Sequence, residues 1–273
     1  MPDDAACVAF LQWALPELGL RWAGFRRPRA QVCKRLARRL RELGLPDLAA
    51  YRRLLAAQPD EWSALDALCR VTISRFWRDR GLFEALARDV LPCLAARAAA
   101  RGAALLRAWS AGCGSGEEPF SLVLAWELGV PARSALGLRV LATDVDEDVL
   151  ERARRAIYPE SSLRELPLAW REVAFERVSQ GLRLRDRFRT PVELRRADVR
   201  HALPEERFDL VLCRNLAFTY FAEPVQRCVL ERLASRLVAG GALAVGRHEA
   251  LPEGQPWFAP WGAATSLYER RAS

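Results

Sequence analysis

The sequence predicts an all-helical N-terminal domain followed by an α/β domain with a mainly parallel, doubly wound sheet. Up to about residue 95, apolar residues recur every three or four positions, which is the helical period. From about residue 103, short apolar runs typical of strands alternate with helical segments, and this alternation favours a parallel sheet. A glycine-rich loop joins the first of these strands to a helix. We therefore assign residues 1–95 to the helical domain and 96–273 to the α/β domain.

The strongest helical pattern of the first domain is basic and amphipathic. Its apolar positions are Val32, Leu36, Leu40 and Leu43. Its other side carries Lys34, Arg35, Arg38, Arg39 and Arg41. Gly44 and Pro46 end this helix, and the segments LPDLAAYRRLL and DEWSALDALCRV are typical of further short helices.

The second domain is expected to contain four main strands, at residues 104–110, 138–143, 208–213 and 242–246. Helical patterns lie at residues 118–128, 147–156 and 223–238. Sheets of this kind bind ligands at the carboxyl ends of their strands, which is where the glycine loop falls. At about residues 170–197, apolar and charged residues alternate in two runs, which predicts a small β-insert. Alternatively, the second run, PVELRRADV, belongs to the main sheet.

The composition is that of a globular protein with a substantial core, because 51% of the 273 residues are hydrophobic. No stretch approaches the roughly 20 uninterrupted apolar residues of a membrane span, and the first residues, MPDDAACVAF, carry acids where a signal peptide carries bases. We therefore expect a cytoplasmic protein. The seven scattered cysteines and two histidines predict neither a disulfide framework nor a metal site. The cysteines are expected to be small buried side chains in a reduced compartment.

The net charge of +8 is concentrated around the basic helix. Residues 21–53 hold eleven basic and two acidic residues, a surplus of +9, so the rest of the chain is close to neutral. Such a cluster is either a solvated helix face or a docking surface for an acidic partner, and its field would steer an anionic partner. A basic helix would also suit phosphate contacts with nucleic acid.

The glycine loop lies within LLRAWSAGCGSGEEPFSLVL. Gly112, Gly114 and Gly116 permit a sharp turn and close approach of a ligand to backbone N–H groups. Two glutamates follow at the expected start of a helix, where they would repel a pyrophosphate, so a cationic or zwitterionic ligand such as S-adenosylmethionine (SAM) fits better. Taken in isolation, the loop is also compatible with a plain turn.

An aspartate follows the second strand in the segment LATDVDEDVL. Asp144 lies 28 residues beyond Gly116, where an acid is well placed to accept hydrogen bonds from ribose hydroxyls. The alternative for Asp144 is a helix N-cap. Asp146 could fill that position while Asp144 faces the ligand.

Several motifs in order along the chain resemble the CheR family of SAM-dependent protein-glutamate O-methyltransferases. The matching segments are KRLARRLRELG, SRFWRD, WSAGCGSGEEPFS, ATDVDEDVLERARRAIY, FDLVLCRN with a nearby YF, and LVAGGALAVGRHE. The resemblance covers nearly the whole chain and implies a Rossmann-like methyltransferase domain. It implies a cofactor site made of Ser74, Arg78, Gly112, Gly114, Gly116, Glu118, Asp144, Asp198, Arg214 and Asn215.

The resemblance also implies roles for these residues. Ser74 and Arg78 would close over the cofactor and the reactive centre. Glu118 would hold the methionine ammonium group and Asp144 the ribose. Asp198 would face the adenine, where the family more often has asparagine.

The implied methyl-transfer pocket is lined by Arg214, Asn215 and Tyr220, with Arg78 and Tyr220 as the catalytic residues. A glutamate with a pKa of about 4.3 is already a nucleophile at neutral pH, so the reaction needs alignment rather than a base. An arginine fork suits that task, and Arg78 is our first candidate. The chain departs from the family pattern at Trp77, usually phenylalanine, and by one extra residue before Tyr220.

The resemblance finally implies a partner and leaves two alternatives. In the family, the basic helix is thought to meet the glutamate-rich methylation region of a chemoreceptor. The β-insert resembles one that binds a receptor tether in some members, but its loop is shorter here, which favours tether-independent recognition. A nucleic-acid methyltransferase is one alternative, although no nucleic-acid partner is expected. A SAM-binding regulatory module without activity is the other.

Overall fold

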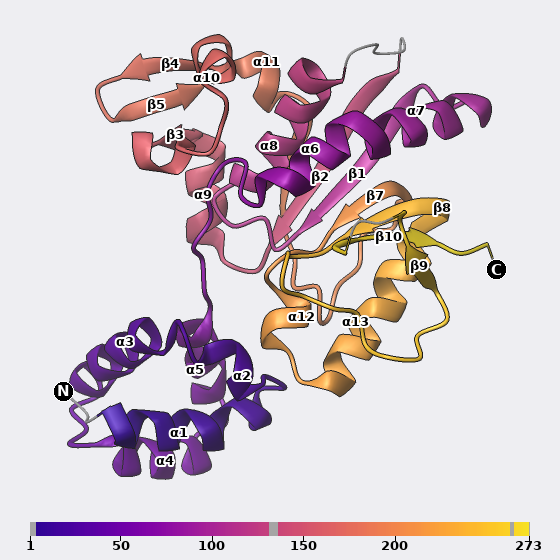
Figure 1. Ribbon diagram of the computed structural model, residues 1–273. Helices are drawn as coiled ribbons and strands as arrows, with labels where there is room; N and C mark the ends of the chain where they lie inside the picture. The colour runs from indigo at the N-terminus through magenta and orange to yellow at the C-terminus, as the bar shows by residue number, and fades with distance from the viewer. Residues whose placement is uncertain (1–3, 131–135, 263–264, 273) are drawn as a thin grey trace. The chain divides into compact units, whose positions relative to one another are not determined.

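The computed structural model describes residues 4–130, 136–262 and 265–272 (Figure 1). These residues form two compact units, and each is described separately below. No helix within the described ranges is long and apolar enough to cross a lipid bilayer.

The two units are not simple halves of the chain. The first consists of the residues up to Val71 together with the later segment 219–226. The second consists of residues 72–218 and the residues from Arg227 onward. Residues 219–226 therefore belong to the N-terminal unit, although they lie between strands β7 (Phe208–Leu212) and β8 (Leu237–Ala244) of the second unit in the sequence.

The division after Val71 falls earlier than the boundary at residue 95 expected from the helical pattern. Three elements account for the difference: α6 (Arg80–Ala85), η1 (Leu86–Val90) and α7 (Leu91–Ala100). Their apolar residues are buried in the same core as the strands of the sheet. Helical periodicity identifies a helix but does not tell which core the helix joins.

The first unit is all-helical, as predicted. Its described elements are α1 (Asp4–Glu17), α2 (Trp22–Phe25), α3 (Arg29–Glu42), α4 (Leu48–Ala57) and α5 (Glu61–Cys69). The expected basic helix is α3, which buries Val32, Leu36 and Leu40. It ends before Gly44, whose φ of +66° is the left-handed conformation that glycine adopts readily at a helix end.

One expectation about the cysteines is wrong. Cys7 of α1 and Cys33 of α3 form a disulfide, with their Cα atoms 6.0 Å apart. They are separated by 26 residues in the sequence and become neighbours because α1 packs against α3. Spacing along the chain carries no signal for this pairing. Three of the other cysteines, Cys69, Cys113 and Cys213, are buried free thiols as expected.

Two of the five basic residues assigned to the outer face of α3 are instead turned inward. Arg39 donates from Nε and Nη2 to the two carboxylate oxygens of Glu61, at 2.9 and 2.7 Å. The hydroxyl of Tyr51 donates to the same carboxylate at 2.7 Å. Arg35 donates to the backbone oxygen of Leu68 at 3.1 Å and to that of Arg70. These arginines stabilise the unit, while Lys34, Arg38 and Arg41 remain exposed.

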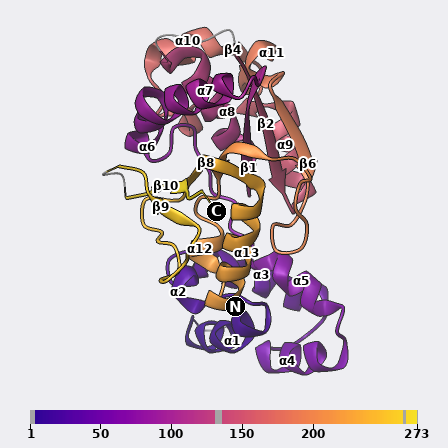
Figure 2. The same cartoon turned by 90° about the vertical axis from the view of Figure 1, so that its right-hand side faces the viewer.

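The second unit contains the predicted, mainly parallel sheet (Figures 1 and 2). Its strand order is β6 (Val192–Arg196), β2 (Gly137–Asp144), β1 (Leu105–Ala111), β7 (Phe208–Leu212), β8 (Leu237–Ala244), β10 (Leu267–Arg270) and β9 (Phe258–Pro260). The first five run parallel, β10 is antiparallel to β8, and β9 is antiparallel to β10. The strand order reverses beside β1, and ligands bind at such reversal points.

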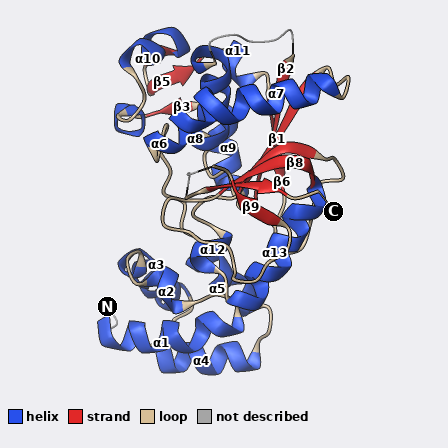
Figure 3. Ribbon diagram, turned by 45° about the vertical axis from the view of Figure 1, so that its right-hand side comes forward, coloured by secondary structure: helices blue, strands red, loops and turns tan. Residues whose placement is uncertain are grey.

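Helices cover both faces of the sheet (Figure 3). On one face, Leu106, Ala108 and Val140 share a core with α6, α7 and α8 (Glu117–Leu124). The alternating residues of β1 and β7, such as Trp109 and Val211, are buried on the opposite face, where α13 (Glu223–Arg236) lies. This burial on both faces explains why the strands read as continuous apolar runs.

The predicted β-insert is present, but it consists of different strands from those expected. It is a three-stranded antiparallel sheet of β3 (Ile157–Tyr158), β5 (Gly181–Leu184) and β4 (Phe175–Val178), with α10 (Leu168–Ala174) beside it. The run PVELRRADV is β6 at the edge of the main sheet, so the alternative assignment is the correct one. The insert contacts the glycine loop directly, because the hydroxyl of Tyr158 donates to the backbone oxygen of Ser115 at 2.6 Å.

We expect Glu61→Gln to lower the free energy of unfolding by about 1–3 kcal/mol at pH 7, because Arg39 and Tyr51 lose their shared carboxylate. The hydrogen bond from Arg39 lowers the pKa of Glu61 below its ordinary value. Its contribution is therefore present at neutral pH and is lost as the pH falls below about 4.5 towards the folded pKa. Urea unfolding of both proteins across this range measures the difference.

The matched control for this experiment is Asp60→Asn. Asp60 is exposed and forms no side-chain cap hydrogen bond, so its amide variant should unfold like the parent protein. An equal loss in both variants, or a loss for Glu61→Gln that is independent of pH, would contradict the assignment.

Candidate cofactor and methyl-transfer site

The glycine loop connects β1 to α8 as predicted, and its glycines have distinct tasks. All three adopt positive φ, at +77° for Gly112, +55° for Gly114 and +92° for Gly116. A Cβ on Gly112 would lie 2.5 Å from Leu216, and one on Gly116 would lie 2.6 Å from the ring of Phe120. These two glycines are required by packing within the protein. Gly114 has no atom closer than 3.9 Å to such a Cβ and is the glycine that leaves room for a ligand.

Asp144 lies at the end of β2 and contacts this loop. Its Oδ2 accepts from the backbone N–H of Gly114 at 2.9 Å, and its Oδ1 accepts from that of Asp146 at 3.0 Å. Asp146 in turn accepts from the N–H of Asp148 and caps α9 (Glu147–Arg155). As expected, Asp146 is the N-cap of the helix, and Asp144 lies beside the glycine loop.

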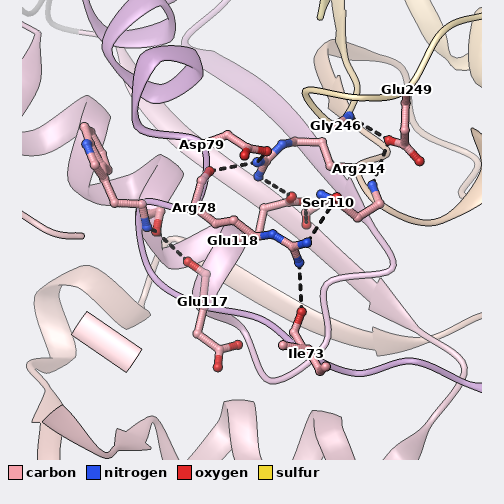
Figure 4. A network of polar contacts seen from close by, with 12 residues as sticks. Ile73, Arg78, Asp79, Ser110, Glu117, Glu118, Arg214, Gly246 and Glu249 are labelled. Atoms are coloured by element: carbon pink, nitrogen blue, oxygen red, sulfur yellow. Dashed lines mark hydrogen bonds and ion pairs between the residues drawn. The ribbon is translucent and has the colours of Figure 1, made fainter. Parts of the chain in front are cut away.

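Glu118, from the first turn of α8, is part of a buried ion-pair network (Figure 4). Arg214 donates to Glu118 at 2.8 Å, to the carboxylate of Asp79 at 2.8 Å and to the backbone oxygen of Arg78 at 2.8 Å. The other oxygen of Glu118 accepts from the hydroxyl of Ser110 at 2.7 Å. Burial raises the pKa of Glu118, and Arg214 offsets part of this effect.

Glu117 is a second buried acid at the same helix start. Glu117 is 5% exposed, and its Oε2 has no hydrogen-bond partner within the described residues. Burial raises the pKa of Glu117, while a contact with the hydroxyl of Ser74 opposes this change. Ser74 also lies nearest to the open position over Gly114. The structure thus brings Ser74, Gly114 and Glu117 together.

Arg78 lies between two residues with an unusual backbone conformation, and its side chain is held by hydrogen bonds. The residues before and after it, Trp77 and Asp79, are both left-handed, with φ of +59° and +64°. The N–H of Trp77 donates to the hydroxyl of Ser121 on α8 at 2.9 Å. The guanidinium donates to the backbone oxygen of Ile73 at 2.9 Å. It also donates to the side chain of Asn215 at 3.2 Å, so two of the expected site residues touch.

Two expected site residues are placed differently from the rest. Asp198 follows β6 at the same sheet edge as Asp144, but its carboxylate is engaged by Arg200, with Nη2 to Oδ2 at 2.8 Å. Burial would raise the pKa of Asp198, but the hydrogen bonds from Arg200 outweigh it and lower the pKa. Tyr220 belongs to the first unit, where its ring packs on Phe25 with ring centres 5.2 Å apart. The roles expected for these two residues stay predictions.

The chemistry of this arrangement suits a cationic ligand with hydroxyl groups. Four carboxylates lie around the glycine loop and the start of α8. Arg214 pairs with two of them, and the charge of Arg152 acts on Glu117. The acids are Asp79, Glu117, Glu118 and Asp144. A phosphate at the start of α8 would meet two buried carboxylates, whereas an ammonium group would be stabilised by them. The residues present therefore fit SAM, with its ammonium, sulfonium and ribose groups, and exclude a pyrophosphate at this loop.

These features define a SAM-binding methyltransferase domain joined to a helical domain, and comparison with known families agrees. Residues 72–266 match the CheR methyltransferase SAM-binding domain, and residues 28–67 match the CheR methyltransferase all-alpha domain. The chain belongs to the CheR methyltransferase family and is a SAM-dependent methyltransferase.

Several curated proteins are similar to this chain. A chemotaxis protein methyltransferase of Salmonella typhimurium is 34% identical over 233 residues, covering 81% of this chain and 76% of that protein. One of Listeria monocytogenes is 33% identical over 183 residues, covering 67% of each. The "Probable biofilm formation methyltransferase WspC" of Pseudomonas aeruginosa is 33% identical over 250 residues, covering 89% of this chain and 57% of that protein.

Sequence reasoning missed several residues that shape the site. Asp79 lies in the quoted segment SRFWRD and Glu249 in LVAGGALAVGRHE, so the motifs contained both residues without indicating a role. Ser110 and Ser121 are small polar residues inside apolar runs, where each must find a hydrogen-bond partner. That burial pattern is the one signal by which these serines could have been found.

The affinity for SAM should fall on acidification, by up to about tenfold per pH unit once the pH is below the raised pKa of Glu118. The reason is that protonation removes the negative charge that would bind the ammonium group. In Glu118→Gln the affinity should be low throughout, with a flatter pH profile. Calorimetric titration with SAM between about pH 5 and 8 measures both.

Glu172→Gln serves as the control, because Glu172 is exposed on α10. Its pH profile should overlay that of the parent protein. If Glu118→Gln kept the parent profile as well, Glu118 would not be the group that binds the ammonium.

Proposed function

We propose that this methyltransferase transfers a methyl group from SAM to glutamate side chains of a protein, forming glutamyl methyl esters, and that the protein is a chemoreceptor. In this reaction a carboxylate oxygen attacks the methyl carbon while the carbon–sulfur bond breaks, so no proton has to move. A catalytic histidine is therefore unnecessary, in keeping with a chain that has only two histidines.

The position of Arg78 is the observation that supports this proposal most. A guanidinium has five N–H donors, and Arg78 uses two of its nitrogens on Ile73 and Asn215. Within the described residues, Arg78 forms no ion pair, so donors remain for an acceptor carboxylate. A fork held at both sides can align that carboxylate with the methyl group.

The cofactor side of the proposal rests on the acids around the glycine loop. We assign the methionine ammonium to Glu118, the ribose to Asp144, and contacts over the loop to Ser74 and Gly114. When bound, SAM supplies an electrophilic methyl group on a sulfonium. Arg214 orients Glu118 in this scheme, because it donates to one oxygen while Ser110 donates to the other.

The surface on which the acidic partner would dock includes three of the five basic residues in the sequence motif. Arg35 and Arg39 are used inside the first unit, as described above. Lys34, Arg38 and Arg41 are exposed at helical spacing along α3. We propose that this stripe binds the acidic methylation region of a chemoreceptor in the cytoplasm. The relatives named for chemotaxis support a receptor as the substrate.

Arg78→Ala should abolish methyl transfer while SAM affinity stays within about tenfold, a difference of roughly 1.4 kcal/mol. The loss follows because the acceptor carboxylate is no longer aligned. Receptor-containing membranes are incubated with methyl-labelled SAM and then treated with alkali. Label in an ester is released as volatile methanol, whereas label on nitrogen or a ribose oxygen stays in place.

Arg80→Ala is the matched control, because Arg80 is exposed and pairs with Glu84 four residues later. It should transfer label like the parent protein. Label that resists alkali would refute the ester and favour a nucleic-acid or other acceptor. SAM binding without any label transfer would favour a regulatory module, and full activity of Arg78→Ala would remove Arg78 from the catalytic role.

Reversing the charge of the stripe should weaken recognition of the receptor without affecting the cofactor. For the triple variant Lys34→Glu, Arg38→Glu and Arg41→Glu, we expect kcat/KM for the receptor to fall about tenfold or more at low salt. The difference from the parent protein should shrink as salt screens the charges. Initial rates at several salt concentrations, with SAM affinity measured in parallel, test this.

A triple variant with the same change in net charge is the control. Arg88, Arg207 and Arg271 are exposed residues of the second unit, outside the β-insert. If their reversal to glutamate lowered kcat/KM as much as reversal of the stripe, net charge rather than the stripe would control association.

A further inference from the structure

The segment GRHE after β8 contains a buried glutamate that the proposed function does not use. Glu249 is 7% exposed. Its Oε2 accepts from the backbone N–H of Gly246 at 2.6 Å and from that of Asn215 at 2.7 Å. Its own N–H donates to the oxygen of Gly246 at 2.9 Å, which closes a tight turn. One carboxylate oxygen thus joins two loops, as Figure 4 shows.

The two loops are neighbours at the carboxyl edge of the sheet. β7 and β8 are parallel and adjacent, and the N–H of Cys213 donates to the oxygen of Ala244 at 2.9 Å just beyond their ends. A Cβ on Gly246 would lie 2.8 Å from Oε2 of Glu249 and 3.1 Å from Cγ of Asn215. Gly246 is therefore needed for the close approach of the glutamate to both backbones.

Asn215 is held in an unusual conformation at this contact. Its φ of +53° is left-handed, which asparagine tolerates better than most residues but which still needs support from its surroundings. The hydrogen bond from its N–H to the Glu249 carboxylate is charge-assisted and short. In this conformation, the side-chain oxygen of Asn215 accepts from Nη2 of Arg78 at 3.2 Å.

We infer that Glu249 is a positioning residue for Arg78 and acts through Asn215. The carboxylate holds the Asn215 backbone, the Asn215 side chain holds one arm of the Arg78 guanidinium, and the Ile73 carbonyl holds the other. This inference rests on the proposed role of Arg78 in aligning the acceptor carboxylate. Glu249 has no contact with the reacting atoms in this scheme, so its effect is on alignment and not on the chemistry itself.

Glu249→Ala should lower kcat for receptor methylation about 10- to 100-fold, because Asn215 loses a charge-assisted hydrogen bond and Arg78 loses its fixed orientation. SAM affinity should stay within about threefold of the parent value. Glu249→Gln keeps a carbonyl oxygen that can accept both N–H groups, so its kcat should stay within about fivefold. A purely structural role would instead change the melting temperature and SAM affinity together with kcat.

A second pair of variants tests the relay without disturbing Glu249. Asn215→Gly adopts a positive φ freely but has no side-chain oxygen, so its kcat should fall about 10- to 100-fold. This variant tests the relay even if Glu249→Ala does not fold. Asn215→Asp keeps the acceptor and should retain more activity than Asn215→Gly. Glu253→Gln, an exposed glutamate of the same C-terminal region, is the control and should behave like the parent protein.

The outcomes separate this inference from the proposed function. Parent-like kcat in Asn215→Gly, or in a folded Glu249→Ala, would overturn the relay while inactivity of Arg78→Ala left the proposed function standing. Full activity of Arg78→Ala would overturn both. A loss of kcat in Glu249→Ala and Asn215→Gly that Glu249→Gln restores, at unchanged SAM affinity, is the result expected from positioning.

Discussion

The site depends on the buried guanidinium of Arg214, whose side chain is 2% exposed. A buried charge of this kind is tolerated only when it is paired and hydrogen-bonded, and Arg214 has two carboxylate partners and one carbonyl partner. Glu118 comes from α8 and Asp79 from the segment after Arg78. One ion therefore joins the loop after β7 to the start of α8 and to the segment after Arg78, and the loss of either carboxylate would leave it with a single buried counter-charge.

Backbone strain is concentrated around the same ion. Trp77, Asp79 and Asn215 all have positive φ, although none is glycine. Each such residue costs on the order of 1–3 kcal/mol and persists only when the surroundings hold it. The supports are the Ser121 hydroxyl for Trp77, Arg214 for Asp79 and the Glu249 carboxylate for Asn215. Because two of these residues flank Arg78 and the third contacts it, the strain is placed where side-chain direction matters most.

The sequence predicted the layers, the glycine loop and the basic helix, because each is a local pattern with a known period or turn. It did not reveal which face Arg35 and Arg39 occupy, since their partners Leu68 and Glu61 lie more than 20 residues away. The same limit hid the pairing of Cys7 with Cys33. Asp79 and Glu249 were visible inside motifs, but their partners come from other strands and loops, and only the folded sheet edge brings them together.

The acids that suit SAM create a problem for an anionic acceptor. Four carboxylates surround the proposed cofactor site, and the Glu249 carboxylate lies behind Asn215, so a glutamate side chain would be repelled as it approached. Arg78 offers a favourable charge only at short range. Under the proposed function, the attraction for an acidic segment would come from charge elsewhere, and Lys34, Arg38 and Arg41 form an exposed basic stripe. In the proposed function, separation of recognition from alignment would let one chain bind a cationic methyl donor and an anionic acceptor.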